Sequence, residues 1–156
     1  MKSYIDWNPE LIKRMVDEGH IVANHSDTHR DFPNLTGKQI ENEIHATARS
    51  FEKLTGLEMP RYFRPPSGVY SERVLAYMKD LDYKTIFWSS AYLDWEVNNQ
   101  PGKARAYQMI VDYAHNGAII LLHAISKSNA EALGDAIDAL LGQGYIFKSL
   151  DELPDY

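Results

Sequence analysis

The stretch Ala118-Ile119-Ile120-Leu121-Leu122-His123 decides the fold class, because one polar residue closes a run of five apolar ones. Such a short apolar run is typical of a strand that is buried on both faces of a sheet. Apolar residues at helical spacing flank the run, over residues 104–114 before it and residues 128–141 after it. The pattern therefore predicts a buried parallel strand between two helices, with His123 at the carboxyl end of the strand.

The same alternation of helix and strand extends along the whole chain. Further helices are predicted at residues 8–19, 36–56 and 71–81, and further strands at residues 21–24, 62–63, 85–88 and 145–147. Thr36–Gln39 and Ser128–Glu131 both have the sequence pattern of a capping box at a helix start. Regular alternation of this kind predicts an α/β fold of parallel strands covered by outer helices, either a barrel or an open sheet.

Length, charge and composition exclude several classes of protein. With 156 residues and 44% hydrophobic residues, the chain is predicted to form a single domain over residues 1–156. A net charge of −6, with scattered Lys and Arg, argues against a nucleic-acid or anionic-membrane partner. No apolar run is long enough to span a bilayer. Because the chain has no cysteine, any metal must bind to histidine and carboxylate ligands.

Four polar sites follow four predicted strands. His25 follows residues 21–24, Arg64 follows residues 62–63, Asp94-Trp95 lies in the loop after residues 85–88, and His123 follows residues 118–122. In folds with parallel strands the reactive groups gather where the strands end. The spacing therefore predicts that all four sites lie at one rim of the fold.

The segment His25-Ser26-Asp27-Thr28-His29 places two imidazoles at a separation that lets both bind one metal ion. Asp27, Asp31 or Asp6 is a hypothetical third ligand, suggested by proximity in the sequence alone. The plainer interpretation of both histidines is that they are solvated or hydrogen-bonded side chains.

The segment Arg64-Pro65-Pro66-Ser67-Gly68 places a cation before a stiff turn. The prolines have no N–H group, so the amides of Ser67 and Gly68 are expected to be free to bind an oxyanion. The alternative is an arginine that pairs with a surface carboxylate beside an ordinary turn.

The Asp94-Trp95 pair offers a carboxylate that can orient a histidine and an indole that can form the wall of a sugar groove. His123 at the end of an apolar strand is suited to protonate a leaving group. A solvated aspartate, a tryptophan at the rim and a hydrogen-bonded histidine are the alternatives without catalysis.

Taken in order, these segments resemble the motifs of the polysaccharide deacetylases, the family with the NodB-type catalytic domain, over nearly the whole chain. The resemblance implies a (β/α) barrel in which His25 and His29 bind a divalent metal, most often zinc and sometimes cobalt. It also implies that Arg64 positions an acidic residue and that the Ser67 amide helps to bind the oxyanion.

The later motifs of the family carry the remaining roles. The resemblance implies that Asp94 orients the catalytic histidine and that Trp95 lines the substrate groove. In the Leu121-Leu122-His123 segment, it implies that Leu121 lines the acetate pocket and that His123 is the general acid. The expected activity is therefore a metal-dependent hydrolase that removes N-acetyl groups from a carbohydrate polymer.

The first motif of the family, Thr-Phe-Asp-[Asp/Asn]-Gly, has no match in these residues. In the family it supplies the catalytic base and often a metal ligand. The expected fold is thus a partial barrel that lacks one or two N-terminal strands, with exposed sheet edges that favour self-association. Because catalytic zinc usually has three protein ligands, the two histidines alone predict weak or absent metal binding.

Segments 87–101 and 129–133 resemble the branch of the family that deacetylates N-acetylmuramic acid in peptidoglycan during formation of muramic δ-lactam in spore cortex. The expected substrate is then peptidoglycan, and the expected place of action is the cell envelope or spore, outside the cytoplasm. Two alternatives stay open: a glycan-binding pseudoenzyme that keeps the Trp95 groove, and a non-catalytic α/β protein with structural histidines.

Overall fold

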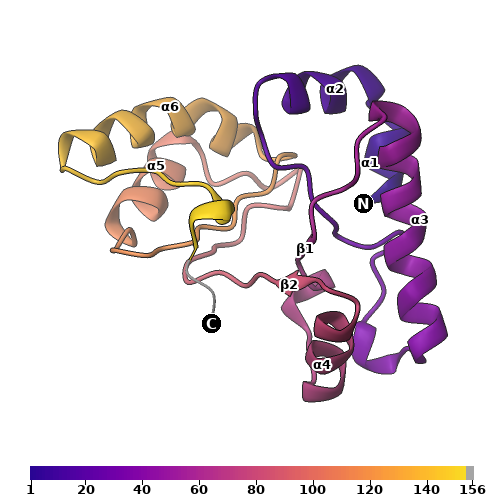
Figure 1. Cartoon of the computed structure of the whole chain (residues 1–156). Helices are drawn as coiled ribbons and strands as arrows, with labels where there is room; N and C mark the ends of the chain where they lie inside the picture. The colour runs from indigo at the N-terminus through magenta and orange to yellow at the C-terminus, as the bar shows by residue number, and fades with distance from the viewer. Residues whose placement is uncertain (154–156) are drawn as a thin grey trace. The chain divides into compact units, whose positions relative to one another are not determined.

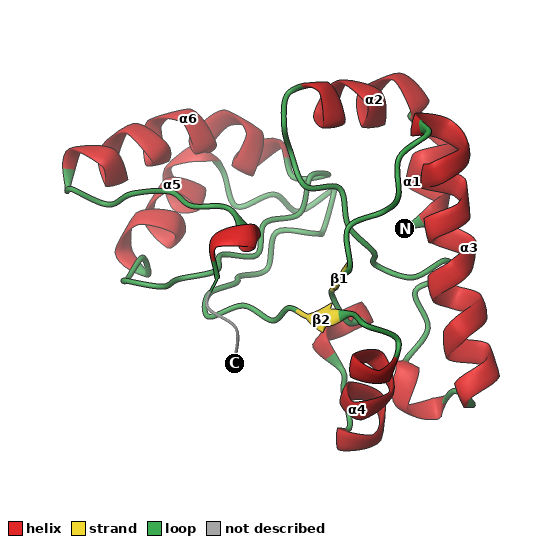
Figure 2. Ribbon diagram, in the orientation of Figure 1, coloured by secondary structure: helices red, strands yellow, loops and turns green. Residues whose placement is uncertain are grey.

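The computed structural model describes residues 1–153, which form two compact units. Unit 1 is Met1–Phe87, and unit 2 is Trp88–Tyr156, of which residues 88–153 are described. Helices joined by long loops make up most of each unit, and the two short strands lie in unit 1 (Figure 2). Each unit is described by itself below.

The helices of unit 1 are α1 (Lys2–Trp7), α2 (Pro9–Asp17), α3 (Gly37–Thr55) and α4 (Glu72–Asp80), with 3-10 turns at Phe32–Asn34 and Pro66–Gly68. The predicted capping box at the start of α3 is confirmed, because the side chains of Thr36 and Gln39 each accept a hydrogen bond from the other residue's backbone. Gly56 ends α3 in the left-handed conformation, with φ 73°. The short helix α1 was not predicted from the sequence.

The strands of unit 1 are parallel, as predicted, but short. β1 (Tyr62–Phe63) pairs with β2 (Lys84–Thr85), with Tyr62 opposite Lys84. On the other side of β1, Asn24 forms a single parallel bridge with Phe63. Of the predicted strand at residues 21–24, only Asn24 pairs, and Ser26 turns the chain two residues later, with φ 66°.

Two hydrophobic clusters form the core of unit 1. The first lies between α3, α4 and the strands, and the second lies between α1, α2 and α3, which are neighbours in Figure 1. The fully or nearly buried members of the first include Phe32, Ile40, Ile44, Phe63 and Met78. Burial of α3 along two sides explains its length of 19 residues, because tertiary packing stabilises a helix more than propensity does.

Unit 2 pairs two helices over extended segments. α5 (Lys103–Asp112) packs beside α6 (Lys127–Gly142) around Ile110, Ala136 and Leu140 (Figure 1), and a 3-10 turn follows at Leu150–Glu152. The helix start predicted at Ser128–Glu131 is wrong by two residues, because the side chain of Ser126 accepts the Asn129 N–H and caps α6.

The strands predicted in unit 2 are reduced or absent. Residues 118–122 form one parallel bridge, Ser90 to Ile120, supported by hydrogen bonds from Ser89 N to Ile119 O and from Leu121 N to Ser90 O. Residues 145–147 are not a strand, and the Ile146 side chain is 80% exposed. A strand needs a partner, and none of the described segments pairs with this one.

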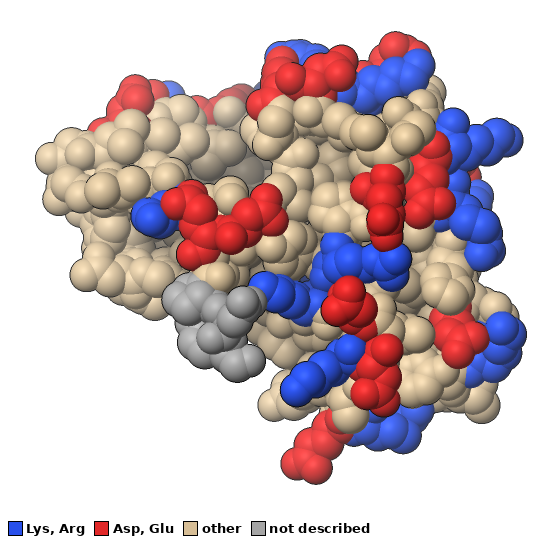
Figure 3. All heavy atoms as spheres, in the orientation of Figure 1, with Lys and Arg blue, Asp and Glu red and all other residues tan. Residues whose placement is uncertain are grey.

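Parallel pairing and covering helices together make a partial α/β fold, which confirms the predicted fold class. On the visible face, Lys and Arg side chains are interspersed with Asp and Glu side chains (Figure 3). Among residues 1–153, no helix combines the length and the hydropathy needed to cross a bilayer.

Candidate active site

The loop that carries His25 and His29 is fixed by polar contacts with α3. Asn24 is 2% exposed, donates from Nδ2 to the Ile44 carbonyl at 2.9 Å, and accepts the Ser26 N–H through Oδ1 at 3.0 Å. The buried Ser26 hydroxyl oxygen accepts the His29 N–H at 3.0 Å. Left-handed φ values at Ser26 and His29 bend the chain so that the two histidines face each other.

Glu43 holds the middle of the same loop. This helix residue is 7% exposed, and its carboxylate accepts the N–H groups of Asp27 and Thr28 and the hydroxyl of Thr28. The three hydrogen bonds offset the cost of burying the charge. The loop between the two histidines is therefore held to α3 at Asp27 and Thr28.

The two imidazoles lie edge to face, with ring centroids 5.0 Å apart. His25 Nδ1 is 2.7 Å from the Arg64 carbonyl oxygen, which can only accept, so Nδ1 carries the proton and Nε2 keeps a free lone pair. Burial, and then the Arg64 charge, lower the pKa of His25 to about 3. His25 is therefore neutral at physiological pH, which is the form that binds a metal.

Arg64 follows β1 directly, as His25 follows the bridge at Asn24, and both lie at the same end of the parallel pair. Burial lowers the pKa of the Arg64 guanidinium, although arginine stays charged in proteins. Within residues 1–153 no carboxylate forms an ion pair with this guanidinium. The alternative interpretation, an arginine paired with a surface carboxylate, is therefore not found in the part of the chain that the structure describes.

The turn after Arg64 differs in one respect from the sequence prediction. Ser67 has a left-handed φ of 54° and its amide makes no hydrogen bond with the described residues, whereas the Gly68 N–H donates to the Pro65 carbonyl at 3.1 Å. Both amides were predicted to be free, and for Gly68 this is wrong because the 3-10 turn uses its N–H. Ser67 alone keeps a free amide in an exposed position.

The chemistry of the donor set decides whether a metal fits unit 1. Two neutral imidazoles, one oriented by a carbonyl through its other nitrogen, are a fitting pair for a zinc-type ion. Residues 1–153 contain no group of three or more His, Asp or Glu side chains that can hold a metal. Asp27, Asp31 and Asp6, the hypothetical third ligands, form no such group with the two histidines in this part of the chain.

In unit 2, Asp94 and His123 form a tight pair. Asp94 is 1% exposed, and its Oδ1 accepts the His123 Nδ1–H at 2.6 Å while its Oδ2 accepts the His123 backbone N–H at 2.7 Å. A carboxylate on Nδ1 fixes the tautomer and leaves Nε2 of His123 as the nitrogen available to another molecule. The half-buried imidazole can then give or take a proton at a fixed place.

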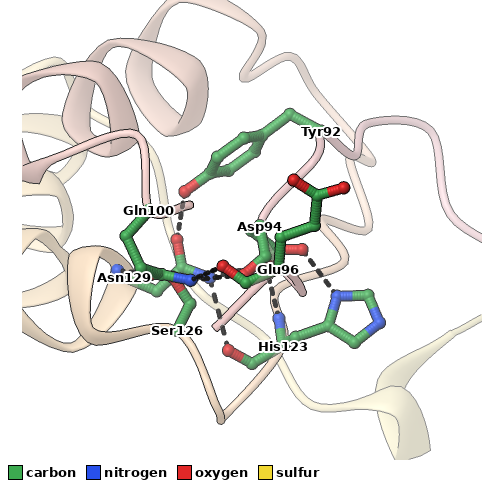
Figure 4. Close-up of polar contacts among 7 residues, drawn as sticks. All are labelled: Tyr92, Asp94, Glu96, Gln100, His123, Ser126 and Asn129. Atoms are coloured by element: carbon green, nitrogen blue, oxygen red, sulfur yellow. Dashed lines mark hydrogen bonds and ion pairs between the residues drawn. The ribbon is translucent and has the colours of Figure 1, made fainter. Parts of the chain in front are cut away.

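Two amide side chains surround this pair, as Figure 4 shows. Asn129 donates to Asp94 Oδ2 at 2.6 Å, and Gln100 donates to the Asp94 carbonyl at 3.2 Å. Gln100 also accepts the Ser126 hydroxyl at 2.7 Å, which ties the loop of Asp94 to the start of α6. The end of the His123 loop that leads into α6 is thereby connected to the loop of Asp94.

Trp95 and Leu121 flank the pair. The Trp95 indole is 50% exposed and stands at 62° to the His123 ring, with centroids 5.5 Å apart. An exposed aromatic face beside an imidazole is suited to stack against a sugar ring. Leu121 is partly buried, two residues before His123, and its N–H is used by the bridge to Ser90.

The sequence prediction missed Glu43, Gln100 and Asn129. Glu43 is a charged residue inside the apolar stripe of α3, three residues after Ile40 and four before the buried Thr47, and this position was the available signal. Asn129 lies in the predicted capping box at residues 128–131, and both Asn129 and Gln100 lie in segments that were singled out for their resemblance, 129–133 and 87–101. Neither signal indicated a contact with Asp94.

Comparisons with known proteins identify the family. Residues 1–86 match the family model described as polysaccharide deacetylase. The chain is 51% identical over 150 residues to peptidoglycan-N-acetylmuramic acid deacetylase PdaA of Bacillus subtilis, covering 96% of the chain and 57% of the relative. The chain thus spans little more than half the length of this curated relative.

Solved structures give the same result. The structure of Bacillus subtilis PdaA, a family 4 carbohydrate esterase, has 51% identity and a TM-score of 0.92, and the alignment covers 96% of this chain and 64% of that one. A family 4 pseudoenzyme from Bacillus anthracis has 32% identity and a TM-score of 0.81, with 91% of this chain and 49% of that one covered. The chain belongs to the polysaccharide deacetylase family.

Proposed function

We propose that this chain carries the acid and metal-binding parts of a metal-dependent hydrolase that removes N-acetyl groups from peptidoglycan, with N-acetylmuramic acid as the deacetylated sugar. The observation that carries the proposal is the Asp94–His123 pair, with an acid-base histidine fixed by a buried carboxylate at 2.6 Å. The 51% identity to a peptidoglycan-N-acetylmuramic acid deacetylase supports the choice of substrate.

In the proposed reaction, His123 protonates the amine that leaves when the acetamide C–N bond breaks. Asp94 holds the imidazole in the tautomer whose Nε2 meets the substrate and stabilises the charged ring. Trp95 offers its exposed face to the sugar ring, and Leu121 lines the pocket of the acetyl methyl group. Acetate and a free amino sugar are the products.

In unit 1, His25 and His29 would hold the metal, with zinc the first choice and cobalt the second. When bound, a divalent metal supplies a Lewis acid that activates water and polarises the acetyl carbonyl. The free amide of Ser67 donates to the oxyanion of the tetrahedral intermediate. Arg64 contributes a half-buried cation that can position a carboxylate.

The proposed partner and place of action follow from the substrate. Peptidoglycan is a neutral-to-acidic glycan of the cell envelope, so the proposed site of action is extracytoplasmic, in the envelope or spore. Single-domain folding of residues 1–156 and self-association through sheet edges stay predictions.

Acetate release from N-acetylated peptidoglycan, measured with and without added zinc or cobalt, tests the proposal. His123→Gln should lower kcat by roughly 10²- to 10⁴-fold, as expected for loss of a general acid. His115→Gln is the matched control, because this exposed imidazole contacts only the neighbouring Asn116 carbonyl among the described residues. Equal activity of the two variants, or no release with either metal, would refute the hydrolase.

A glycan-binding pseudoenzyme is the second candidate. The incomplete ligand group and the similarity to a pseudoenzyme structure favour it. It requires peptidoglycan affinity that depends on Trp95 and is unchanged by metal chelation, together with absence of acetate release. Pull-down of the parent chain and of Trp95→Ala with insoluble peptidoglycan, with and without chelator, separates the two candidates.

A further inference from the structure

We infer that Asn129 is a positioning residue for the Asp94–His123 pair, and that the Tyr92 hydroxyl sets the orientation of the Asn129 amide. The inference rests on the proposed role of His123 as the general acid and adds the side chains that fix its geometry. The four side chains form one chain of hydrogen bonds, from Tyr92 through Asn129 and Asp94 to His123 (Figure 4).

The Asp94 carboxylate has two oxygens with separate tasks. Among residues 1–153, Oδ1 accepts a hydrogen bond only from the His123 Nδ1–H, whereas Oδ2 accepts both the His123 backbone N–H at 2.7 Å and the Asn129 Nδ2–H at 2.6 Å. A carboxylate held through Oδ2 by two donors from different segments cannot rotate about its Cβ–Cγ bond without breaking both bonds. Asn129 thus fixes the direction in which Oδ1 meets the imidazole.

The Asn129 amide has one chemically acceptable orientation. Its Nδ2 must face Asp94, because a carboxylate accepts hydrogen bonds and would repel the amide oxygen. Its Oδ1 then faces Tyr92, whose hydroxyl donates to it. Nδ2 also lies 3.4 Å from the His123 carbonyl oxygen, so the same amide contacts both members of the pair.

Burial makes the hydrogen bonds of Asn129 and Asp94 costly to lose. Asn129 is 5% exposed and Asp94 is 1% exposed, so neither side chain has water as a ready substitute partner. Burial, followed by the Asp94 charge, raises the pKa of the Tyr92 hydroxyl, which keeps it in the donating form. The Asn129 backbone N–H is also bound, to the hydroxyl oxygen of the α6 cap Ser126. Helix α6 therefore presents the amide from a fixed position.

Nuclear magnetic resonance of the histidine rings tests the inference without using activity. In the parent chain labelled with ¹⁵N, His123 is assigned by its absence in His123→Gln and shows the Nδ1–H tautomer with a proton that exchanges slowly with water. Asn129→Ala should make that proton exchange about tenfold faster, as expected for loss of a hydrogen bond that holds its acceptor. Tyr92→Phe should change the exchange in the same direction by less.

Kinetics of acetate release add a second readout. Asn129→Ala should lower kcat by roughly 10- to 100-fold, with KM little changed, because it displaces the acid without touching the groove. The matched controls are Asn98→Ala, in the exposed part of the loop that carries Asp94, and Tyr113→Phe, an exposed ring at the end of α5. Both controls should keep parent exchange and parent kcat.

The outcomes are distinct. Unchanged His123 exchange in folded Asn129→Ala, or equal changes in Asn98→Ala, overturn the inference. A change confined to KM also overturns it, because such a change shows a binding role.

If the parent chain releases no acetate, the proposed function fails, and the exchange measurement still decides whether Asn129 positions His123. If Asn129→Ala does not fold, Tyr92→Phe decides: unchanged exchange refutes the inference, and faster exchange supports it.

Discussion

Glu43 and Asp94 are buried carboxylates in different units, and each accepts three hydrogen bonds. Glu43 bonds to residues 27 and 28, between the candidate metal ligands His25 and His29, and Asp94 bonds to the candidate acid His123. A buried charge without such partners would cost several kcal/mol. These two residues therefore set where the imidazoles lie, although only Asp94 touches one of them.

His25 makes stability depend on pH. Its folded-state pKa of about 3 lies below the ordinary value of 6.5, so the unfolded chain takes up a proton that the folded chain does not. The contribution of His25 to stability is complete above about pH 6.5 and is lost as the pH falls toward 3. Between pH 7 and pH 4 the free energy of unfolding should fall by up to about 3 kcal/mol from this residue.

Urea unfolding of the parent and of His25→Asn at pH 7 and pH 4 measures this contribution. The variant should lose less stability on acidification than the parent, and His115→Asn should behave as the parent does. An identical loss in parent and His25→Asn would contradict the prediction.

At the scale of single residues, the sequence predicted the polar residues that follow apolar runs, because the end of such a run is visible in the amino-acid sequence. It did not predict that Glu43 is buried, because an acidic residue in a helix can equally face water. The sequence also does not show where the apolar stripe of α3 ends. It also did not predict that the Gly68 amide is used, because that depends on the left-handed Ser67.

The loop between Trp88 and α5 has no helix or strand apart from the bridge at Ser90, and Gln100 is one of its attachments. Gln100 Nε2 donates to the carbonyls of Asp94 and Glu96, and Oε1 accepts the Ser126 hydroxyl and the Ser128 N–H. The loop and the first turn of α6 are thereby joined by one side chain.

Gln100→Ala should destabilise unit 2 by about 1–3 kcal/mol, because it leaves the Ser126 hydroxyl buried without its acceptor. Thermal unfolding monitored by circular dichroism measures the change. The control Gln108→Ala, at an exposed position of α5, should be neutral or slightly stabilising. Equal stability of Gln100→Ala and the parent would show that the loop is held by other contacts.

Among the elements, helices were predicted well and strands poorly. The buried face and the N-terminal cap of α3 depend on residues close together in the sequence. The pattern at Thr36–Gln39 therefore predicted the start of the helix correctly. Residues 118–122 and 145–147 have the apolar composition of strands, but a strand also requires a partner segment at hydrogen-bonding distance, which composition does not encode.

The whole molecule divides its candidate chemistry between the two units. Met1–Phe87 contains the two imidazoles that would hold a metal, and the second unit contains the proposed acid, His123, and the side chains proposed to position it. A ligand stabilises the structure it contacts by mass action. Metal binding and acid positioning should thus be separable in experiments on the full chain.

Excess zinc should slow amide hydrogen exchange in peptides that cover residues 24–29 and 43–44, and leave peptides that cover residues 94–100 and 123–129 unchanged. Hydrogen exchange read by mass spectrometry measures both regions in one sample. His29→Asn should abolish the effect. Protection of the second region alone would contradict the assignment of the metal to His25 and His29.

The edge-to-face contact between Trp95 and His123 gives the molecule an optical property. A protonated imidazole next to an excited indole accepts an electron from it and quenches its emission, whereas a neutral imidazole does so weakly. With Trp7 and Trp88 replaced by Phe, the fluorescence of this chain reports the proton on its candidate acid directly. The proton can then be followed in solution as the pH or the glycan concentration changes, without a label.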